Sequence, residues 1–496
     1  MLAVELPLLT DRPASLHISD GEGAGLRMPS RRPGPGEQYR FHFDMQACIG
    51  CKCCVVACNE QNGNPAAINW RRVGEIEGGW YPQTSRSYLS MGCNHCLEPT
   101  CLEGCPVDAY TKDPETGIVL HSADTCIGCQ YCTWNCSYGV PQYNPERGVV
   151  GKCDMCHGRL SIGQAPACVS ACPQGAIQIE IVTTAAWRGL SEAAVPVAGV
   201  PVGDHSVSTT RVSSAPLPPN ASLVESTHVR PEHPHWPLVV MTVLTQLSVG
   251  AFAAIWFVQL LGAPARLGVA ALSSMAVAAL ALSASTLHLG RPIHAYRALK
   301  MWRRSWLSRE VLLFGAFSGV ASVYAITLHP TLGAITVLLG LAGVTASAYI
   351  YRVPARPAWN TPLTLAQFLV TAGLLGPLFA AVAGAGDPRA LALTAALMAG
   401  LQFALIAAGF LRCVAADVPE LKGTARLLST VLANRLLMRG VLLAVGGVVL
   451  PLLGLLPVLA LVLAVGAEIL GRYLFFVSVV PTHLAAPYVA AAREAA

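Results

Sequence analysis

Seventeen of the chain's 18 cysteines lie between Cys48 and Cys172, and sixteen of these form four groups of four. The groups are Cys48, Cys51, Cys54 and Cys58; Cys93, Cys96, Cys101 and Cys105; Cys126, Cys129, Cys132 and Cys136; and Cys153, Cys156, Cys168 and Cys172. The first and third groups have the spacing Cys-x2-Cys-x2-Cys-x3-Cys, with which bacterial ferredoxins bind cubane clusters. Sixteen thiolates can supply four ligands to each of four [4Fe-4S] clusters, so this region is predicted to conduct electrons.

Two other uses of dense cysteine fit the pattern less well. Disulfides suit small secreted domains, but no apolar signal segment precedes these cysteines and their number in the region is odd. Zinc sites normally take two Cys-x2-Cys pairs per ion, whereas continuous runs of four cysteines are typical of iron–sulfur clusters. Iron–sulfur chemistry is therefore the prediction.

Within a group, two-residue gaps allow a short loop to turn the first three sulfurs inward around one cluster. The fourth cysteine lies beyond that loop, at the start of a helix. As in two-cluster ferredoxins, we expect it to bind a second cluster. The additional thiol, Cys53, could compete as a ligand, but we interpret it as a small buried side chain.

The composition indicates a membrane protein, because 53% of the residues are hydrophobic and only 12% are charged. We expect an α+β ferredoxin-like domain with four clusters, followed by an all-α bundle of eight transmembrane helices. The predicted parts are a flexible extension over 1–38, the cluster domain over 39–182, a linker or partner-binding arm over 183–235, a membrane anchor with a quinone site over 236–482, and a tail over 483–496.

The membrane part contains apolar runs of the length that crosses a hydrocarbon core, about 20 residues. The expected spans lie near 237–262, 267–288, 310–329, 332–351, 362–384, 390–412, 438–454 and 457–480. The last two are the hardest to separate, because Pro451 and Pro457 interrupt one long apolar stretch.

These motifs resemble a known family, the dimethyl sulfoxide reductase-type molybdoenzymes. Over about 40–182 the cysteine groups, the stretch SYGVPQYNPERG and the run GKCDMC resemble its iron–sulfur subunit. Over 236–480 the stretches HPHWPLVVMTVLTQ, STLHLGRPIHAYRAL, SWLSREVLLF and AEILGRYLFF resemble its eight-helix anchor. The resemblance implies that two subunits are fused here, and that a molybdopterin-containing catalytic subunit is a separate chain.

The resemblance also implies how the cysteines share four [4Fe-4S] clusters. The implied ligand sets are Cys48, Cys51, Cys54 and Cys172; Cys58, Cys153, Cys156 and Cys168; Cys93, Cys96, Cys101 and Cys136; and Cys105, Cys126, Cys129 and Cys132.

A quinone exchanges protons when it changes redox state, so its site needs a proton-handling residue at the membrane edge. Ionisable residues in membrane helices are costly and usually functional. His288 ends the second expected span, Arg291 follows it, and Glu310 opens the third. The resemblance implies a quinol-binding histidine at His288 with a supporting acid at Glu310, and Arg291 is a further candidate. A helix-capping or loop-packing pair is the alternative.

Two further predictions concern the remaining polar residues of the membrane part. Glu468 and Arg472 lie four apart in the last span, which suits a structural intrahelical ion pair. No haem is expected, because the candidate axial ligands lie at span ends or in loops; they are His288, His294, His329 and His483.

The loop charges predict an orientation. With eight spans, the even-numbered loops share a side with the N-terminus; they carry 13 Lys and Arg residues, whereas the odd-numbered loops carry two. The positive-inside rule then places the cluster domain in the cytoplasm, at a bacterial inner membrane. The Arg31 and Arg32 pair is followed by proline instead of an apolar run, so no export signal is expected. Alternatively, the basic loops dock the cluster domain, which has 19 acidic against 14 basic residues over 1–200.

The predicted function is electron transfer between the molybdenum site of a partner and the quinone pool. A cytoplasmic cluster domain resembles the sulfite dehydrogenase branch, which passes electrons from sulfite to quinone. A menaquinol-oxidising subunit of an S-oxide or N-oxide reductase is the alternative, and a cluster-driven ion translocator is a further one. The expected partners are the catalytic subunit, the quinone pool and the lipid bilayer, with no nucleic acid.

Overall fold

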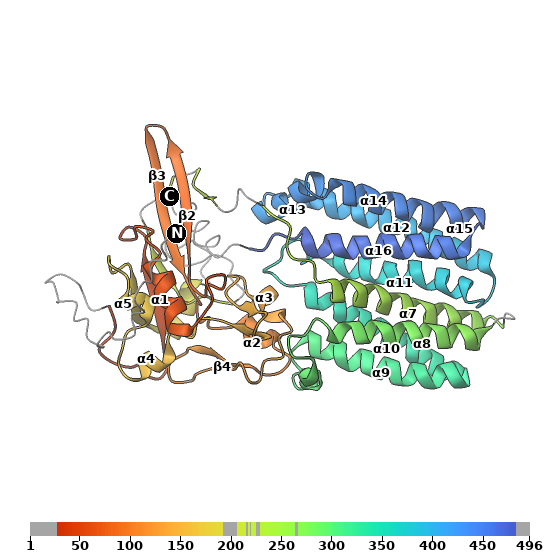
Figure 1. Ribbon diagram of the computed structural model, residues 1–496, viewed down its shortest axis with the longest axis horizontal. Coiled ribbons are helices and arrows are strands. Elements are labelled where there is room, and N and C mark those ends of the chain that lie inside the picture. The colour runs from red at the N-terminus through yellow and green to blue at the C-terminus, as the bar shows by residue number, and fades with distance from the viewer. Residues whose placement is uncertain are drawn as a thin grey trace, which may run out of the picture.

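A computed structural model describes residues 27–191, 206–214, 217–218, 220–224, 229–262 and 266–482. These residues form two bodies along the long axis of the molecule, a mixed domain and a helical bundle (Figure 1). The tail predicted over 483–496, with His483, lies outside the described residues, as does 1–26 of the predicted N-terminal extension.

The first sheet of the mixed domain has the strand order β8-β1-β9. β1 (Glu37–Asp44) pairs antiparallel with β8 (Ile177–Thr183) and parallel with β9 (Arg211–Ser213). Side chains alternate between the two faces of a strand, and Phe41 and Phe43 are buried opposite the isoleucines of β8. This sheet joins the start of the cysteine region to its end.

Three further pairings complete the β structure. β2 (Arg72–Trp80) and β3 (Gln83–Met91) form a long hairpin that projects from the body of the domain, and β10 (Ser222–Leu223) pairs with β2 (Figure 1). Two short hairpins are formed by β4 (Tyr110–Lys112) with β5 (Val119–His121) and by β6 (Gln142–Asn144) with β7 (Val149–Gly151).

Each cysteine group contains or borders a short helix. These are α1 (Cys53–Asn62), α2 (Thr100–Gly104), α3 (Tyr131–Asn135), α4 (His157–Ser161) and α5 (Ala167–Ser170). In the two Cys-Ile-Gly-Cys loops, Gly50 and Gly128 have φ values of 70° and 69°. A glycine adopts this left-handed conformation without steric cost, so both loops can curl before their helix begins.

Part of the segment 183–235 lies on the mixed domain. α6 (Thr184–Ser191) continues β8, and β9 and β10 extend two different sheets. Between them the Thr209 hydroxyl donates to the Asn94 carbonyl at 2.7 Å, and the Thr210 hydroxyl donates to the Asn94 side chain at 2.7 Å. The described residues of this segment therefore form a strap, which lies across the mixed domain and is hydrogen-bonded to the loop of the second cysteine group.

The second body confirms the predicted helical bundle. Among the described residues, eight helices are long and apolar enough to cross a membrane. They are α7 (Trp236–Leu260), α8 (Leu267–Thr286), α9 (Trp306–Thr327), α10 (Pro330–Tyr351), α11 (Pro362–Val382), α12 (Pro388–Ala415), a composite span over Ala433–Leu453, and α16 (Pro457–Val477). The composite span consists of α14 (Ala433–Leu443), a π-helical stretch η3 (Ala444–Val449) and α15 (Leu450–Leu453).

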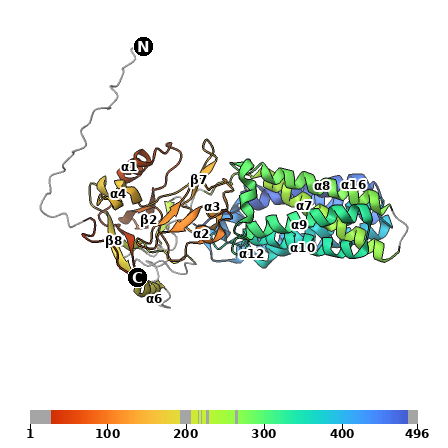
Figure 2. The ribbon, with the colours of Figure 1, turned by 90° about the horizontal axis from the view of Figure 1, so that it is seen from below.

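Two connections of the bundle carry helices of their own. A 3-10 helix, η2 (Pro292–Leu299), lies between α8 and α9, and α13 (Pro419–Ser429) lies between α12 and α14. Figures 1 and 2 place α2 and α3 next to the end of the bundle that faces the mixed domain. The second and third cysteine groups therefore meet the membrane body.

Candidate functional site

The fold brings the cysteines of the four groups together in crossed sets. Each set contains cysteines from two different groups, and its thiols lie close enough to affect one another's pKa. Burial and three neighbouring thiols raise the pKa of Cys48, Cys58 and Cys132, and burial and two neighbouring thiols raise the pKa of Cys101. The sets are Cys48, Cys51, Cys54 and Cys172; Cys58, Cys153, Cys156 and Cys168; Cys93, Cys101 and Cys136, with Cys96 in the same loop; and Cys105, Cys126, Cys129 and Cys132. The resemblance implies the same sets, with Cys96 completing the third; we number them first to fourth, and their role as cluster ligands stays a prediction.

The donor sets fit iron–sulfur clusters. All four thiols of the first set line one small cavity, together with apolar side chains such as Phe43 and Ile177. Four cysteines that face one small cavity fit a cubane cluster, in agreement with the ferredoxin-type spacing of the groups.

The interpretation of Cys53 as a buried thiol is wrong. Its side chain is exposed at the start of α1 and interacts with Cys51. Lys52, with φ of 60°, turns the chain before the helix, and Cys53 then faces away from the interior that Cys54 enters.

Three buried side chains lie between consecutive sets, and the sequence analysis missed all three. Arg71 is near thiols of the first and second sets, and Lys152 is near thiols of the second and third. Tyr110 is near thiols of the third and fourth. Burial alone would lower the pKa of Lys152, but the charges of Cys93, Cys101 and Cys153 raise it above its ordinary value. The only sequence signal was the position of Lys152 beside Cys153.

The fourth set lies against the membrane body. The amide of Gly290 donates to the carbonyl of Gly128 at 3.4 Å, and the amide of Arg291 donates to the carbonyl of Ile127 at 3.1 Å. A side chain at Gly290 would meet the backbone of Gly148. Glycine at these positions therefore allows the fourth-set loop to touch the connection that follows α8.

A cavity of about 260 Å³ begins at this contact and extends into the bundle. Cys129 of the fourth set lines it, together with His288 and Glu310. Its other walls are mostly apolar; they include Ile127, Trp134, Leu238, Met241, Phe314, Ile350 and Tyr351. The structure thus brings the two predicted quinone residues to one cavity with a cysteine of the fourth set.

His288 has a defined tautomer. Its Nδ1 is hydrogen-bonded to the carbonyl oxygen of Ser285. Because a carbonyl oxygen can only accept, Nδ1 carries the proton and the neutral ring keeps a lone pair on Nε2. Burial lowers the pKa of His288 to about 4, although the Ser285 carbonyl opposes the shift. At neutral pH this side chain is a proton acceptor.

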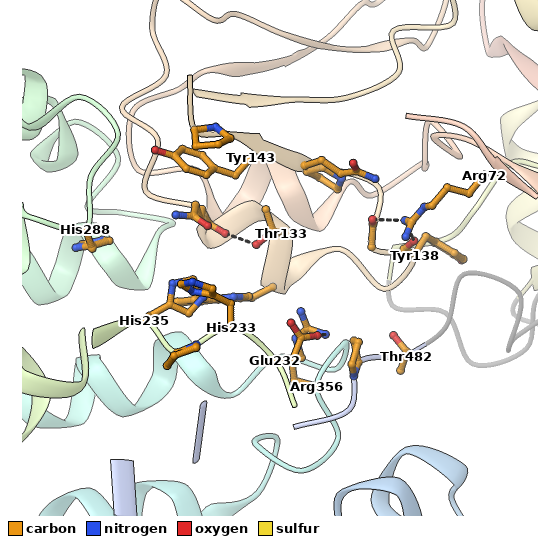
Figure 3. A pocket seen from close by; sticks show the side chains of 18 of the residues that line it. Arg72, Thr133, Tyr138, Tyr143, Glu232, His233, His235, His288, Arg356 and Thr482 are labelled. Atoms are coloured by element: carbon orange, nitrogen blue, oxygen red, sulfur yellow. Dashed lines mark hydrogen bonds and ion pairs between the residues drawn. The ribbon is translucent and has the colours of Figure 1, made fainter. Parts of the chain in front are cut away.

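His288 also lines a second, larger cavity of about 810 Å³ between the two bodies. Figure 3 shows that His233, His235, Glu232 and Arg356 project into it from the bundle side. The His235 ring lies 5.3 Å, centre to centre, from the ring of Trp134, which lines both cavities. None of these side chains was identified as a site residue from the sequence, because the cavity that they line forms only where the bundle meets the mixed domain.

Arg291 does not line either cavity. Its guanidinium donates to the carbonyl of Ala123 at 2.8 Å, on the mixed domain. Nearby, Arg304 forms a 2.7 Å ion pair with Asp108, and the side chain of Arg297 donates to the carbonyl of Asp124 at 3.0 Å. Several basic residues of the second loop therefore dock the mixed domain.

The prediction of an ion pair between Glu468 and Arg472 is wrong. The carboxylate of Glu468 accepts hydrogen bonds from Thr371 at 2.7 Å and Gln402 at 3.1 Å, and it lies 3.9 Å from Arg439 of α14. Arg472 instead donates to Gln246 at 3.0 Å. Facing helices offer Glu468 better partners than its own helix does.

Comparisons with known proteins match both bodies. A 4Fe-4S dicluster domain family matches residues 84–181, and the DMSO reductase anchor subunit (DmsC) family matches residues 231–477. One relative is from the anaerobic dimethyl sulfoxide reductase of Haemophilus influenzae; it is 40% identical over 150 residues, which are 28% of this chain and 73% of the relative. Its counterpart from Escherichia coli strain K12 is 40% identical over 148 residues, 28% of this chain and 72% of the relative.

A subunit of the sulfite dehydrogenase of Allochromatium vinosum is 35% identical over 160 residues, 28% of this chain and 67% of the relative. Each of these relatives thus matches 28% of this chain, the dicluster family matches 84–181 in the mixed domain, and the anchor family covers the bundle. The chain therefore belongs to the dimethyl sulfoxide reductase-type molybdoenzyme family, and it joins that family's iron–sulfur subunit and membrane anchor subunit in one multi-pass polypeptide.

Proposed function

We propose that this chain carries electrons through four [4Fe-4S] clusters between a molybdenum-containing catalytic partner and a quinone bound in the 260 Å³ cavity. The observation that carries the proposal is that Cys129, His288 and Glu310 line the same cavity. A redox group held by the fourth set then borders the space in which a quinone ring would lie. Mostly apolar walls with a few convergent polar groups are typical of small-molecule sites.

The chain's own residues supply the proton chemistry. A quinol releases two protons when it gives up two electrons, and Nε2 of neutral His288 can accept one of them. Glu310 is buried on the facing helix and brings a carboxyl group to the same cavity. His288 also lines the larger cavity between the bodies, which supplies access to water beside His233 and His235.

The opposite end of the series of sets suits a catalytic partner. Ile49 and Val56 beside the first set are 56% and 60% exposed, and Cys51 is exposed as well. Exposed apolar residues around a redox site are suited to a protein contact. The relatives belong to dimethyl sulfoxide reductase and sulfite dehydrogenase, so the partner is proposed to hold the molybdenum site.

The same residues serve electron flow in either direction. The loop charges favour a cytoplasmic cluster domain at a bacterial inner membrane, and with it sulfite oxidation linked to quinone reduction. Menaquinol oxidation by an S-oxide or N-oxide reductase is the second candidate, favoured by the 40% identity to the dimethyl sulfoxide reductase relatives. Assaying the purified complex with sulfite and a quinone, and with an S-oxide and a quinol, separates the two.

The test of the quinone site is His288→Ala in the membrane-bound complex. We expect the rate of cluster reduction by a quinol analogue to fall at least tenfold while iron content and cluster EPR signals stay at the wild-type level. His329→Ala is the matched control, because His329 is exposed in the connection between α9 and α10 and bonds to Thr331. Unchanged quinol kinetics in His288→Ala would remove the site assignment.

A further inference from the structure

One buried polar side chain lies between each pair of consecutive cysteine sets, a position that we call a junction, and these three side chains differ in charge. The side chain at each junction is almost fully buried: Arg71 is 2% exposed, Lys152 3% and Tyr110 2%. Arg71 lies between the first and second sets, Lys152 between the second and third, and Tyr110 between the third and fourth. Burying an unpaired charge is costly, so two buried cations require an anionic partner.

Arg71 has a permanent charge and incomplete pairing. Its Nη1 donates to the hydroxyl of Ser90 at 3.1 Å, and that hydroxyl lies 3.3 Å from the sulfur of Cys54 in the first set. The guanidinium carbon of Arg71 lies 4.6 Å from the centre of the Phe41 ring. Nε and Nη2 have no hydrogen-bond partner although they are buried. The negative charges that act on Arg71 come from thiolates of the first and second sets, among them Cys54 and Cys168.

Lys152 bridges two sets directly. Its Nζ donates to the sulfur of Cys93 in the third set at 3.8 Å and to the carbonyl of Cys153 in the second set at 2.8 Å. A third hydrogen bond goes to the carbonyl of Val119. Three acceptors use all three N–H groups of an ammonium, whereas a neutral amine has two. This geometry therefore selects the charged form of Lys152.

A fixed positive charge favours reduction of a neighbouring group. Reduction adds one electron to the group that a set holds, so the charge there becomes more negative by one and no bond forms or breaks. In a buried environment the attraction between that electron and a nearby cation is only weakly screened. The charge near a cluster is one of the factors that set its reduction potential.

We propose that Arg71 and Lys152 are built-in positive charges that raise the reduction potentials of the clusters on either side of them. Arg71 acts on the first and second sets, and Lys152 acts on the second and third. The neutral Tyr110 stands at the junction with the fourth set, so an electron that enters beside the quinone cavity gains stabilisation as it moves toward the first three sets. This inference rests on the proposed four clusters.

The test is an anaerobic redox titration of the full complex, followed by cluster EPR. In Lys152→Met we expect the potentials of the second and third clusters to fall, with a change of roughly tenfold in the reduction equilibrium, or about 59 mV for one electron. In Arg71→Met the first and second clusters should shift instead. The fourth cluster should keep its potential in both variants.

Two kinds of control separate charge from structure. Lys152→Arg and Arg71→Lys keep the charge and should keep wild-type potentials. Lys52→Met removes an exposed cation beside the first set, so solvent screening should make its effect much smaller than that of Arg71→Met. If the methionine variants lose clusters that Lys152→Arg and Arg71→Lys retain, the charge requirement is supported.

The inference is overturned by unshifted potentials in fully assembled methionine variants, by an equal shift of all four clusters, or by cluster loss in the charge-conserving variants as well. A wild-type complex with fewer than four clusters would instead contradict the proposed function before any variant is measured.

Discussion

The amide of Arg291 donates a hydrogen bond to the carbonyl oxygen of Ile127, 3.1 Å away. Ile127 lies between Cys126 and Cys129 of the fourth set, and Arg291 follows His288 by three residues. The loop that holds thiols for a redox group is thus bonded to the loop that presents a proton acceptor to the cavity. A hydrogen bond between backbone groups fixes the distance between the two loops more firmly than contacts between long side chains would.

The first prediction tests this contact with Gly290→Ala. The new methyl group would meet the backbone of Gly148, which cannot move aside as a flexible side chain could. We expect quinol-linked cluster reduction to slow roughly tenfold or more, because small misplacements of reacting groups are costly. Cluster EPR should show that all clusters are still assembled.

Gly400→Ala is the matched control for this substitution. Gly400 lies in α12, and nothing is within 4 Å of the position that its Cβ would occupy. Wild-type kinetics in Gly290→Ala would show that the close approach of the two loops is not needed for electron transfer.

The second prediction compares two cysteines. Cys129→Ser should remove the cluster that also uses Cys105, because these thiols belong to one buried set. Cys53→Ser should leave the iron content at the wild-type level, because Cys53 is exposed outside all four sets. Iron and sulfide analysis together with EPR checks both. If the variants lost equal amounts of iron, the assignment of Cys53 would be wrong.

Spacing along the chain was enough to predict the eight helices and to single out the sixteen grouped cysteines. Apolar runs and cysteine motifs are local patterns, and their chemistry does not depend on which segments meet later. His288 and Glu310 became quinone candidates for a related reason, since each stands at the end of an apolar run. The structure places both at one cavity, and their role remains a prediction.

Residues whose role depends on distant neighbours could not be predicted in this way. Arg71 meets Cys168 from almost a hundred residues further along the chain, and Glu468 takes Thr371 and Gln402 as partners from two other helices. Arg291 was a further candidate for the quinone site, but its guanidinium donates to the Ala123 carbonyl of the docked mixed domain and lines neither cavity. Local spacing carries no information about such contacts.

The third prediction concerns Glu180, which holds the strap strand β9 to the sheet. Its carboxylate forms ion pairs with Arg40 at 2.7 Å and Arg211 of β9 at 2.6 Å. Burial raises the pKa of Glu180, but hydrogen bonds from His42 and Arg211 and the charge of Arg40 outweigh it and hold the pKa at about 2. Because the pKa is lower in the folded state, the ionised carboxyl stabilises the fold at pH values above the unfolded-state pKa of about 4.3. This stabilisation is lost as the pH falls toward 2.

Glu180→Gln should therefore cost about 2–3 kcal/mol of unfolding free energy at neutral pH. A difference from wild type should be present throughout pH 5 to pH 8, because the carboxyl is ionised over this range in both the folded and the unfolded state. Thermal unfolding of the anaerobic complex at several pH values checks this. A difference that disappeared at pH 6 would contradict the assigned pKa.

The last prediction concerns the buried charges of the bundle. Glu468 is 2% exposed and lies 3.9 Å from the buried guanidinium of Arg439, and its charge also acts on the buried guanidinium of Arg472 without a direct ion pair. Removing one partner from a buried ionic group costs on the order of 3–5 kcal/mol, because the remaining charge stays buried without compensation. Glu468→Ala should lower stability in detergent by that amount, since it leaves two cations in an apolar bundle.

The exposed ion pair of Asp417 and Lys422 is the control for this buried site. The Lys422 ammonium lies 2.6 Å from the Asp417 carboxylate, and the Asp417 side chain is 99% exposed. Asp417→Ala should lower stability far less than Glu468→Ala, because solvent screens an exposed pair. Replacing Arg439, Glu468 and Arg472 together by methionine should restore much of the stability lost in Glu468→Ala, since an apolar core of similar volume often replaces a buried ionic group without loss. If the triple variant were less stable than Glu468→Ala, the charges would be stabilising one another and not merely compensating for their burial.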